Sequence, residues 1–61
     1  MPVVNVQLLS GRSKDQKTQI AQAITDALVD IGGAKPEGVT VIFSDTDKDD
    51  WASAGVLLSD K

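Results

Sequence analysis

Hydrophobic and polar residues alternate with two different periods along this chain of 61 residues. A period-2 segment runs from about Pro2 to Leu9, with Val, Val and Leu on one face and a mixed set on the other. A second such segment, from about Val39 to Ser44, is rich in β-branched residues. Both segments are predicted to be strands, and neither has a purely polar face that water alone would cover.

Between these strands the pattern takes on the period of a helix. Ser13 is the predicted N-cap, and Gln16 three residues later completes a capping box. Gly32-Gly33 is expected to end the helix in a left-handed C-cap, and Pro36 prevents it from resuming. The apolar stripe of the helix is expected to consist of Ile20, Ile24, Ala27, Leu28 and Ile31.

A strand, a helix and a second strand in succession predict a βαβ unit, with parallel strands and a right-handed crossover. An acidic loop, Asp45 to Asp50, then leads into a segment from Trp51 to Leu58. In that segment Ser53-Ala54-Gly55 is expected to turn a small hairpin. The predicted fold class is therefore α+β, in a single domain over residues 1–61.

Two parallel strands covered by one helix bury too little surface to be stable alone. The chain contains no Cys and no His, so neither a disulfide nor a structural zinc site can reinforce it. One sheet face, carrying Val3, Leu9 and Ile42, has no helix to cover it. We therefore expect a homo-oligomer larger than a dimer.

Charge and composition argue against several classes of function. The formal net charge is −3, and the six basic residues are scattered, so the basic stripe of a nucleic-acid-binding protein is missing. No apolar run is long enough to span a membrane and no signal layout is present, so a cytoplasmic location is expected. The acidic loop departs from a calcium loop at Asp50, where Gly is needed, and at Val56, where Glu is needed, and is interpreted as a solvated turn.

Pro2 is the first candidate for chemistry. Removal of Met1 would leave a secondary amine, and burial lowers the pKa of an α-amino group below its ordinary value of about 8. Such an amine can be a neutral base without help from His or Cys. The alternative is structural, because Pro is also tolerated at the first position of a strand.

Arg12 and Trp51 are the second and third candidates. Arg12 lies between the first strand and the helix N-terminus, where it can grip a carboxylate, or it is a surface arginine. Trp51 is either the wall of a pocket or an interface anchor for the hairpin. Because about ten extended residues reach about 30 Å, Arg12 cannot meet Pro2 within one subunit, and a shared site would need a neighbouring chain.

Taken together, these residues resemble the subunit of the 4-oxalocrotonate tautomerase family over essentially the whole chain. The matching segments are Pro2, Leu9-Ser10-Gly11-Arg12-Ser13, Asp15-Gln16-Lys17, Val39-Thr40-Val41-Ile42 and Trp51 followed by Ala54-Gly55. The resemblance implies a βαβ unit with a hairpin, assembled as a hexamer (a trimer of dimers). It also implies an isomerase that interconverts enol and keto forms of small 2-hydroxydienoate or 2-keto acids without a metal or organic cofactor.

The resemblance further implies a role for each matching residue. Pro2 would be the general base and then the acid, and Arg12 would bind a substrate carboxylate. Trp51 stands where the family has an aromatic residue that keeps the pocket apolar, and the backbone N–H of Leu9 would point into that pocket. Thr40 stands where relatives that act on a dicarboxylate carry a second arginine, so a monocarboxylate enol is expected to fit better.

Two alternatives remain open at this point. One keeps the superfamily but changes the reaction to decarboxylation or hydration of a small unsaturated acid, which an acidic residue paired with the proline would favour. The other is a catalytically idle oligomeric subunit or binding module, which the Thr40 departure and retention of Met1 would favour.

Overall fold

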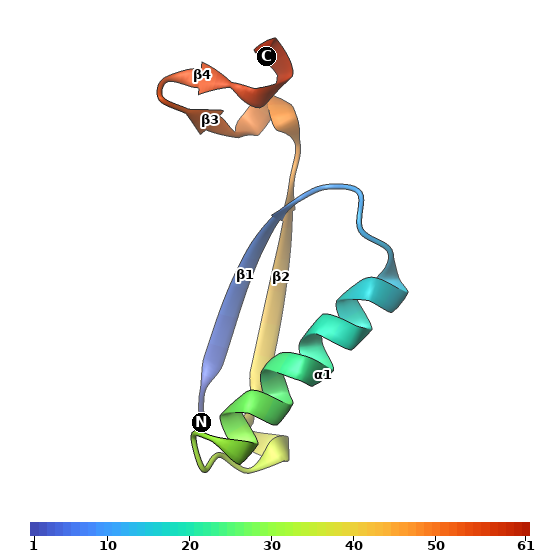
Figure 1. The fold of residues 1–61 in the computed structure, drawn as a ribbon, viewed down its shortest axis with the longest axis vertical. Helices are drawn as coiled ribbons and strands as arrows, with labels where there is room; N and C mark the ends of the chain where they lie inside the picture. The colour runs from blue at the N-terminus through green and yellow to red at the C-terminus, as the bar shows by residue number, and fades with distance from the viewer.

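The computed structural model describes residues 1–61 and has the predicted α+β architecture. Strand β1 is followed by helix α1 and strand β2, and a short hairpin of β3 and β4 ends the chain (Figure 1). The bounds are β1 Val3–Leu9, α1 Lys14–Asp30, β2 Thr40–Thr46, β3 Ala52–Ser53 and β4 Val56–Leu57. Single 3-10 turns occupy Pro36–Gly38, Lys48–Asp50 and Leu58–Asp60.

The two long strands form one parallel pair, and the hairpin forms a separate antiparallel pair. The parallel register runs from Val3 opposite Thr40 to Leu9 opposite Thr46. The predicted parallel βαβ unit is therefore confirmed. The second strand is longer than predicted, because Asp45 and Thr46 continue the ladder instead of beginning the acidic loop.

Helix α1 begins and ends where the sequence predicts. The Gln16 backbone N–H donates to Ser13 Oγ at 3.1 Å, and the Ser13 N–H donates to Gln16 Oε1 at 2.9 Å, which is a complete capping box. Such a cap stabilises a helix by about 1 kcal/mol. At the other end Gly33 has φ +72°, and a Cβ on Gly32 would lie 2.7 Å from the Leu28 carbonyl oxygen. Both glycines are therefore needed to end the helix in this way.

The face of α1 that packs on the sheet differs from the predicted stripe. Ala27 is exposed, and Ile31 is the C-cap residue with 89% of its surface exposed. The half-buried positions of the helix are instead Lys17, Ile20, Ala21, Ile24, Thr25, Leu28 and Val29. The prediction was wrong at Ala27 and Ile31 and omitted Lys17 because it used apolarity alone, whereas the long side chain of a lysine can lie along the sheet and reach a partner at its rim.

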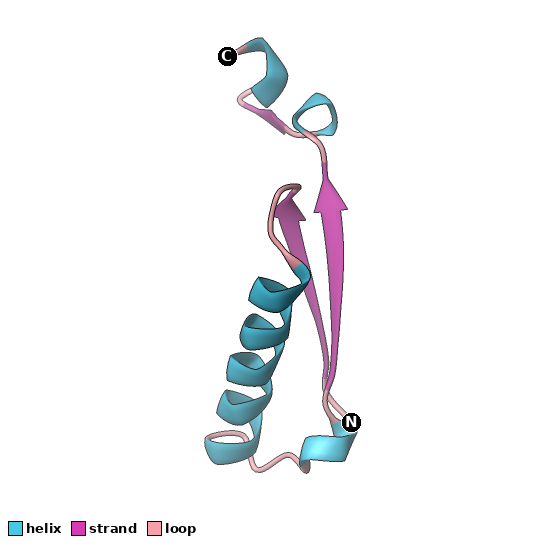
Figure 2. Ribbon diagram, turned by 90° about the vertical axis from the view of Figure 1, so that its right-hand side faces the viewer, coloured by secondary structure: helices cyan, strands magenta, loops and turns pink.

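Helix α1 covers only one face of the parallel pair (Figure 2). The half-buried strand residues alternate with exposed ones, and the exposed set faces away from the helix. On that open face Val3 and Ile42 are 56% and 47% exposed. No residue of the chain is fully buried, so a single protomer has no core in the usual sense.

Residues 47–61, here called the C-terminal arm, extend beyond the end of the parallel strands (Figure 1). The hairpin inside the arm turns at Ala54 and Gly55, as predicted, and both residues have positive φ, of 53° and 78°. Positive φ at both central residues is the requirement of the tight turn that matches strand twist. The arm makes its element contacts mainly with itself, so it gives the βαβ unit no further cover.

Helix α1 falls short of the length and apolar character that a membrane-spanning helix requires.

The open sheet face generates the first prediction. Replacing Ile42 with Asp places a charge on the apolar surface that a neighbouring subunit should cover, so the assembly should dissociate to smaller, less stable species. Sedimentation velocity, together with thermal unfolding at several protein concentrations, measures the effect. The control is Gln19→Asp, which adds the same charge at an exposed helical position. An Ile42→Asp protein with the wild-type assembly would contradict the prediction.

Candidate active site

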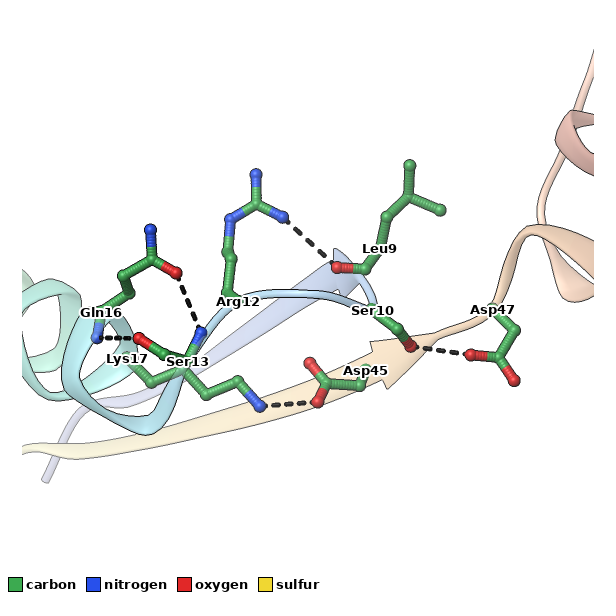
Figure 3. A network of polar contacts seen from close by, with 8 residues as sticks. All are labelled: Leu9, Ser10, Arg12, Ser13, Gln16, Lys17, Asp45 and Asp47. Atoms are coloured by element: carbon green, nitrogen blue, oxygen red, sulfur yellow. Dashed lines mark hydrogen bonds and ion pairs between the residues drawn. The ribbon is translucent and has the colours of Figure 1, made fainter.

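The loop between β1 and α1 places Arg12 at the carboxyl end of β1 (Figure 3). Gly11 in this loop has φ +131°, a conformation that residues with a side chain rarely adopt. Arg12 is exposed, and its Nη1 donates to the Leu9 carbonyl oxygen at 3.3 Å. The guanidinium keeps its other donors free, so it can still bind a carboxylate.

The backbone of Leu9 faces the free edge of the sheet. The Ser10 N–H donates to the Thr46 carbonyl oxygen at 3.0 Å, and the Pro2 carbonyl accepts from the Thr40 N–H at the same distance. Successive backbone amides of a strand point to opposite edges of the sheet. The even-numbered residues from Pro2 to Ser10 therefore direct their backbone hydrogen bonds toward β2. Leu9 is odd-numbered, so its N–H points to the opposite edge of the sheet and can donate to a ligand or a neighbouring chain.

Pro2 lies at the opposite end of β1 from Arg12. Its side chain is half-buried, while Met1 before it is 97% exposed. Strand β1 contains seven residues, which at about 3.3 Å each hold the two ends about 20 Å apart. A site that uses both Pro2 and Arg12 cannot form within one chain.

Trp51 lies in the C-terminal arm, between the 3-10 turn at Lys48–Asp50 and β3. Its backbone is fixed on both sides, because its N–H donates to the Lys48 carbonyl at 3.4 Å and its carbonyl accepts from the Leu58 N–H at 2.8 Å. The side chain is half-buried and lines a pocket of about 260 Å³. The residues lining this pocket are Gln7, Thr46, Asp50, Trp51 and Ala52.

Three of the four predicted site residues therefore gather at one end of the sheet, and Pro2 alone lies at the other. Leu9 pairs in register with Thr46, which lines the Trp51 pocket, and Arg12 contacts the Leu9 carbonyl. Sequence reasoning missed four of the pocket residues, which are Gln7, Thr46, Asp50 and Ala52. Gln7 shares a strand face with Leu9, which was a usable signal, but the other three depend on where β2 ends and how the arm folds.

Two polar contacts tie the Arg12 loop and α1 to the end of β2 (Figure 3). The Ser10 hydroxyl donates to Asp47 Oδ1 at 2.8 Å, and Lys17 Nζ lies 2.6 Å from Asp45 Oδ2. The first contact joins the loop that carries Arg12 to the segment that leads into Trp51. Residues 45–50 do not gather three ligands of the kind that hold a metal ion.

The comparison with known proteins agrees with this geometry. A family model described as "Tautomerase enzyme" matches residues 2–61. A probable tautomerase of Bacillus cereus is 38% identical over 61 residues, which is all of both chains. The 2-hydroxymuconate tautomerase of Bacillus subtilis is also 38% identical, covering 98% of this chain and 97% of its own. The crystal structure of YwhB, a homologue of 4-oxalocrotonate tautomerase, matches with a TM-score of 0.94 at 37% identity, over 98% of each chain.

A βαβ unit with a terminal hairpin, matched over its whole length by enzymes of one kind, defines a small isomerase. The chain belongs to the tautomerase family. The predicted family and the predicted enzyme class are confirmed.

The Ser10–Asp47 contact generates the second prediction. Ser10→Ala and Asp47→Ala should each lower the free energy of unfolding, and the double variant should lose less than their sum, with a coupling of about 0.5–1 kcal/mol. Urea unfolding at one fixed protein concentration measures the cycle. Ser59→Ala, at an exposed position with no side-chain hydrogen bond, is the control. Strict additivity would show that the contact is absent in solution.

Proposed function

We propose that this protein is a cofactor-independent enol–keto tautomerase in which Pro2, exposed by removal of Met1, is the general base and acid. The observation that carries the proposal is the position of Pro2. The family match begins at this residue, its side chain is half-buried, and its carbonyl is held in the sheet by the Thr40 N–H. A proline fixed in this way has a defined direction for its ring nitrogen.

The proposed reaction moves one proton from oxygen to carbon. The Pro2 nitrogen takes the proton of the enol hydroxyl as the electrons of the C=C bond form a new carbon–hydrogen bond with a returned proton. Arg12 of a neighbouring subunit binds the substrate carboxylate, and the Leu9 N–H donates to a substrate oxygen. Trp51 excludes water, which keeps the amine neutral. General acid–base transfer of this type contributes about 10²- to 10⁴-fold in rate.

The proposed assembly is a hexamer with active sites at subunit contacts. The roughly 20 Å that separates Pro2 from the Arg12 end of β1 supports a divided site. The absence of any fully buried residue supports an extensive interface. The proposed location is the cytoplasm.

The proposed substrate is a small monocarboxylate enol. One relative is a 2-hydroxymuconate tautomerase, which by its name acts on a dicarboxylate. In this chain the residue that opens β2 beside Pro2 is Thr40, which is exposed and uncharged. Lys35 does not replace a missing cation there, because it precedes the 3-10 turn at Pro36–Gly38. Among the residues proposed to bind the substrate, Arg12 alone carries a positive charge. This supports a substrate with one carboxylate.

The third prediction tests the role of Pro2. The Met1-free protein should catalyse ketonisation of a 2-hydroxydienoate, and the Met1-retaining protein should not, because an amide nitrogen cannot accept the proton. Pro2→Ala should lose about 10²-fold or more in kcat/KM. Absorbance of the enol measures the rate, and intact mass measures the state of residue 1. Equal rates with and without Met1 would refute the proposed mechanism.

The fourth prediction concerns the position of the missing cation. Thr40→Arg adds a charge-assisted partner beside Pro2, so kcat/KM for 2-hydroxymuconate should rise about tenfold relative to a monocarboxylate enol such as 2-hydroxypenta-2,4-dienoate. Thr40→Gln, similar in polarity but uncharged, is the matched control. A Thr40→Arg enzyme with the wild-type substrate ratio would show that this position does not face the substrate.

A further inference from the structure

One hydrogen bond joins the C-terminal arm to the βαβ unit. It runs from the Ser10 hydroxyl to Asp47 Oδ1, at 2.8 Å (Figure 3). Every other hydrogen bond of the arm joins two residues of the arm itself. No element of the arm packs extensively on β1, β2 or α1. The direction in which the arm leaves the sheet therefore depends on Asp47, which is its first residue.

The carboxylate of Asp47 does not make the contact that is common at its position. Asp47 is the N-cap residue of the 3-10 turn at Lys48–Asp50. An aspartate at an N-cap commonly accepts a hydrogen bond from a backbone N–H of its own turn. The Asp47 side chain makes no such bond. It accepts instead from Ser10, 37 positions away in the chain, so a long-range contact replaces the local cap.

Backbone hydrogen bonds hold the chain in place on both sides of this contact. In the βαβ unit the Ser10 N–H donates to the Thr46 carbonyl at 3.0 Å. In the arm the Asp47 carbonyl accepts from the Asp50 N–H at 2.9 Å, and both backbone groups of Trp51 bond within the arm. The arm can therefore turn about Asp47 as one unit when the Ser10 contact is lost.

The pocket beside Trp51 is built from both of these parts. Gln7 and Thr46 come from the ends of the strands, whereas Asp50, Trp51 and Ala52 come from the arm. A turn of the arm about its first residue would move these two sets apart. The half-buried indole of Trp51 would then become more exposed to solvent.

From this arrangement we propose that Asp47 is a positioning residue. Its hydrogen bond with Ser10 fixes the direction of the arm and so keeps Trp51 in the wall of the pocket. The link to catalysis rests on the proposed function, in which Trp51 excludes water from the active site. The position of the arm itself can be measured without turnover.

Trp51 is the reporter for the test, because it is the only tryptophan in the chain. Quenching of its fluorescence by acrylamide measures how freely solvent reaches the indole. Acrylamide is neutral, so a change in the charge of the protein does not by itself change the quenching. The full-length, Met1-free assembly is used throughout, and sedimentation velocity establishes the assembly of each variant.

Two variants break the contact, since Asp47→Ala removes the acceptor and Ser10→Ala removes the donor. Asp47→Asn is the conservative variant, because its amide oxygen can still accept. Asp49→Ala is the matched control, because it removes a carboxylate from the same 3-10 turn at a residue that does not line the pocket. Ser10→Ala leaves the sequence of the arm unchanged, so it decides the test if Asp47→Ala does not assemble.

The quenching constant should rise about twofold in Asp47→Ala and in Ser10→Ala. The double variant should show no larger rise than either single variant, because both break the same contact. Asp47→Asn and Asp49→Ala should remain close to the wild type. Hydrogen exchange at the Leu58 N–H, which bonds to the Trp51 carbonyl, should stay slow in every variant, because the arm turns without unfolding.

Several results would overturn the proposal. They are unchanged quenching in Ser10→Ala, an equal rise in Asp49→Ala, a rise in Asp47→Asn as large as that in Asp47→Ala, and faster exchange at the Leu58 N–H. A lower midpoint of thermal unfolding without greater quenching would also overturn it, because the contact would then stabilise the fold without positioning Trp51.

A pH–rate profile separates this proposal from the proposed function. In Ser10→Ala the acid limb of kcat/KM should move to higher pH by about half a unit, because water near Pro2 favours the charged amine. If the wild type does not ketonise enols but Trp51 becomes exposed in Ser10→Ala, the proposed function is wrong and the positioning role stands. If the wild type is active and quenching does not change, the proposed function stands and the positioning role fails.

Discussion

Two strands and one helix cannot enclose a side chain, and the rest of this structure depends on that constraint. Every residue of the chain retains some contact with solvent, including the valines and leucines that face α1. The hydrophobic effect scales with apolar area removed from water, so most of the available stabilisation is still unused in a single protomer. Two surfaces can still bury apolar area and so stabilise the protein further. They are the open face of β1 and β2 and the projecting C-terminal arm.

The same constraint decides where chemistry can occur. A proline amine is a useful base only where water is scarce, and one protomer provides no such place around Pro2. Strand β1 holds its two ends apart, so under the proposed mechanism Arg12 at one end and Pro2 at the other would belong to different active sites. The parallel strand pair is therefore a spacer as well as a scaffold.

Local sequence signals predicted the parts of the fold that are decided locally. The capping box at Ser13, the glycines that end α1 and the hairpin turn at Ala54-Gly55 all depend on residues within a few positions of each other. The length of β2 was underestimated because an aspartate such as Asp45 is typical of a loop. In the structure Asp45 lies in the strand, where its carboxylate pairs with the Lys17 amine. Long-range partners of this kind leave no local pattern.

The residues of the candidate site, like the elements of the fold, could be predicted only in part from the sequence. Arg12 and Trp51 could be singled out by residue type and spacing, and the structure places both at the carboxyl end of the sheet. Asp50 could not be singled out, because in the sequence it is one of several acidic residues in a polar run. Only the fold of the arm distinguishes it from Asp49, because Asp50 lines the pocket and Asp49 does not.

The separation of Pro2 from Arg12 along β1 also has a genetic consequence. In the proposed divided site, a substitution in one subunit affects the sites it shares with its neighbours, because each subunit would supply Arg12 to one site and Pro2 to another. Two inactive alleles, one damaged at each end of the strand, can then complement in a mixed assembly, because some of its sites combine the two intact halves. A single damaged allele produced in excess has the opposite effect, and it lowers the activity of the normal chains with which it assembles.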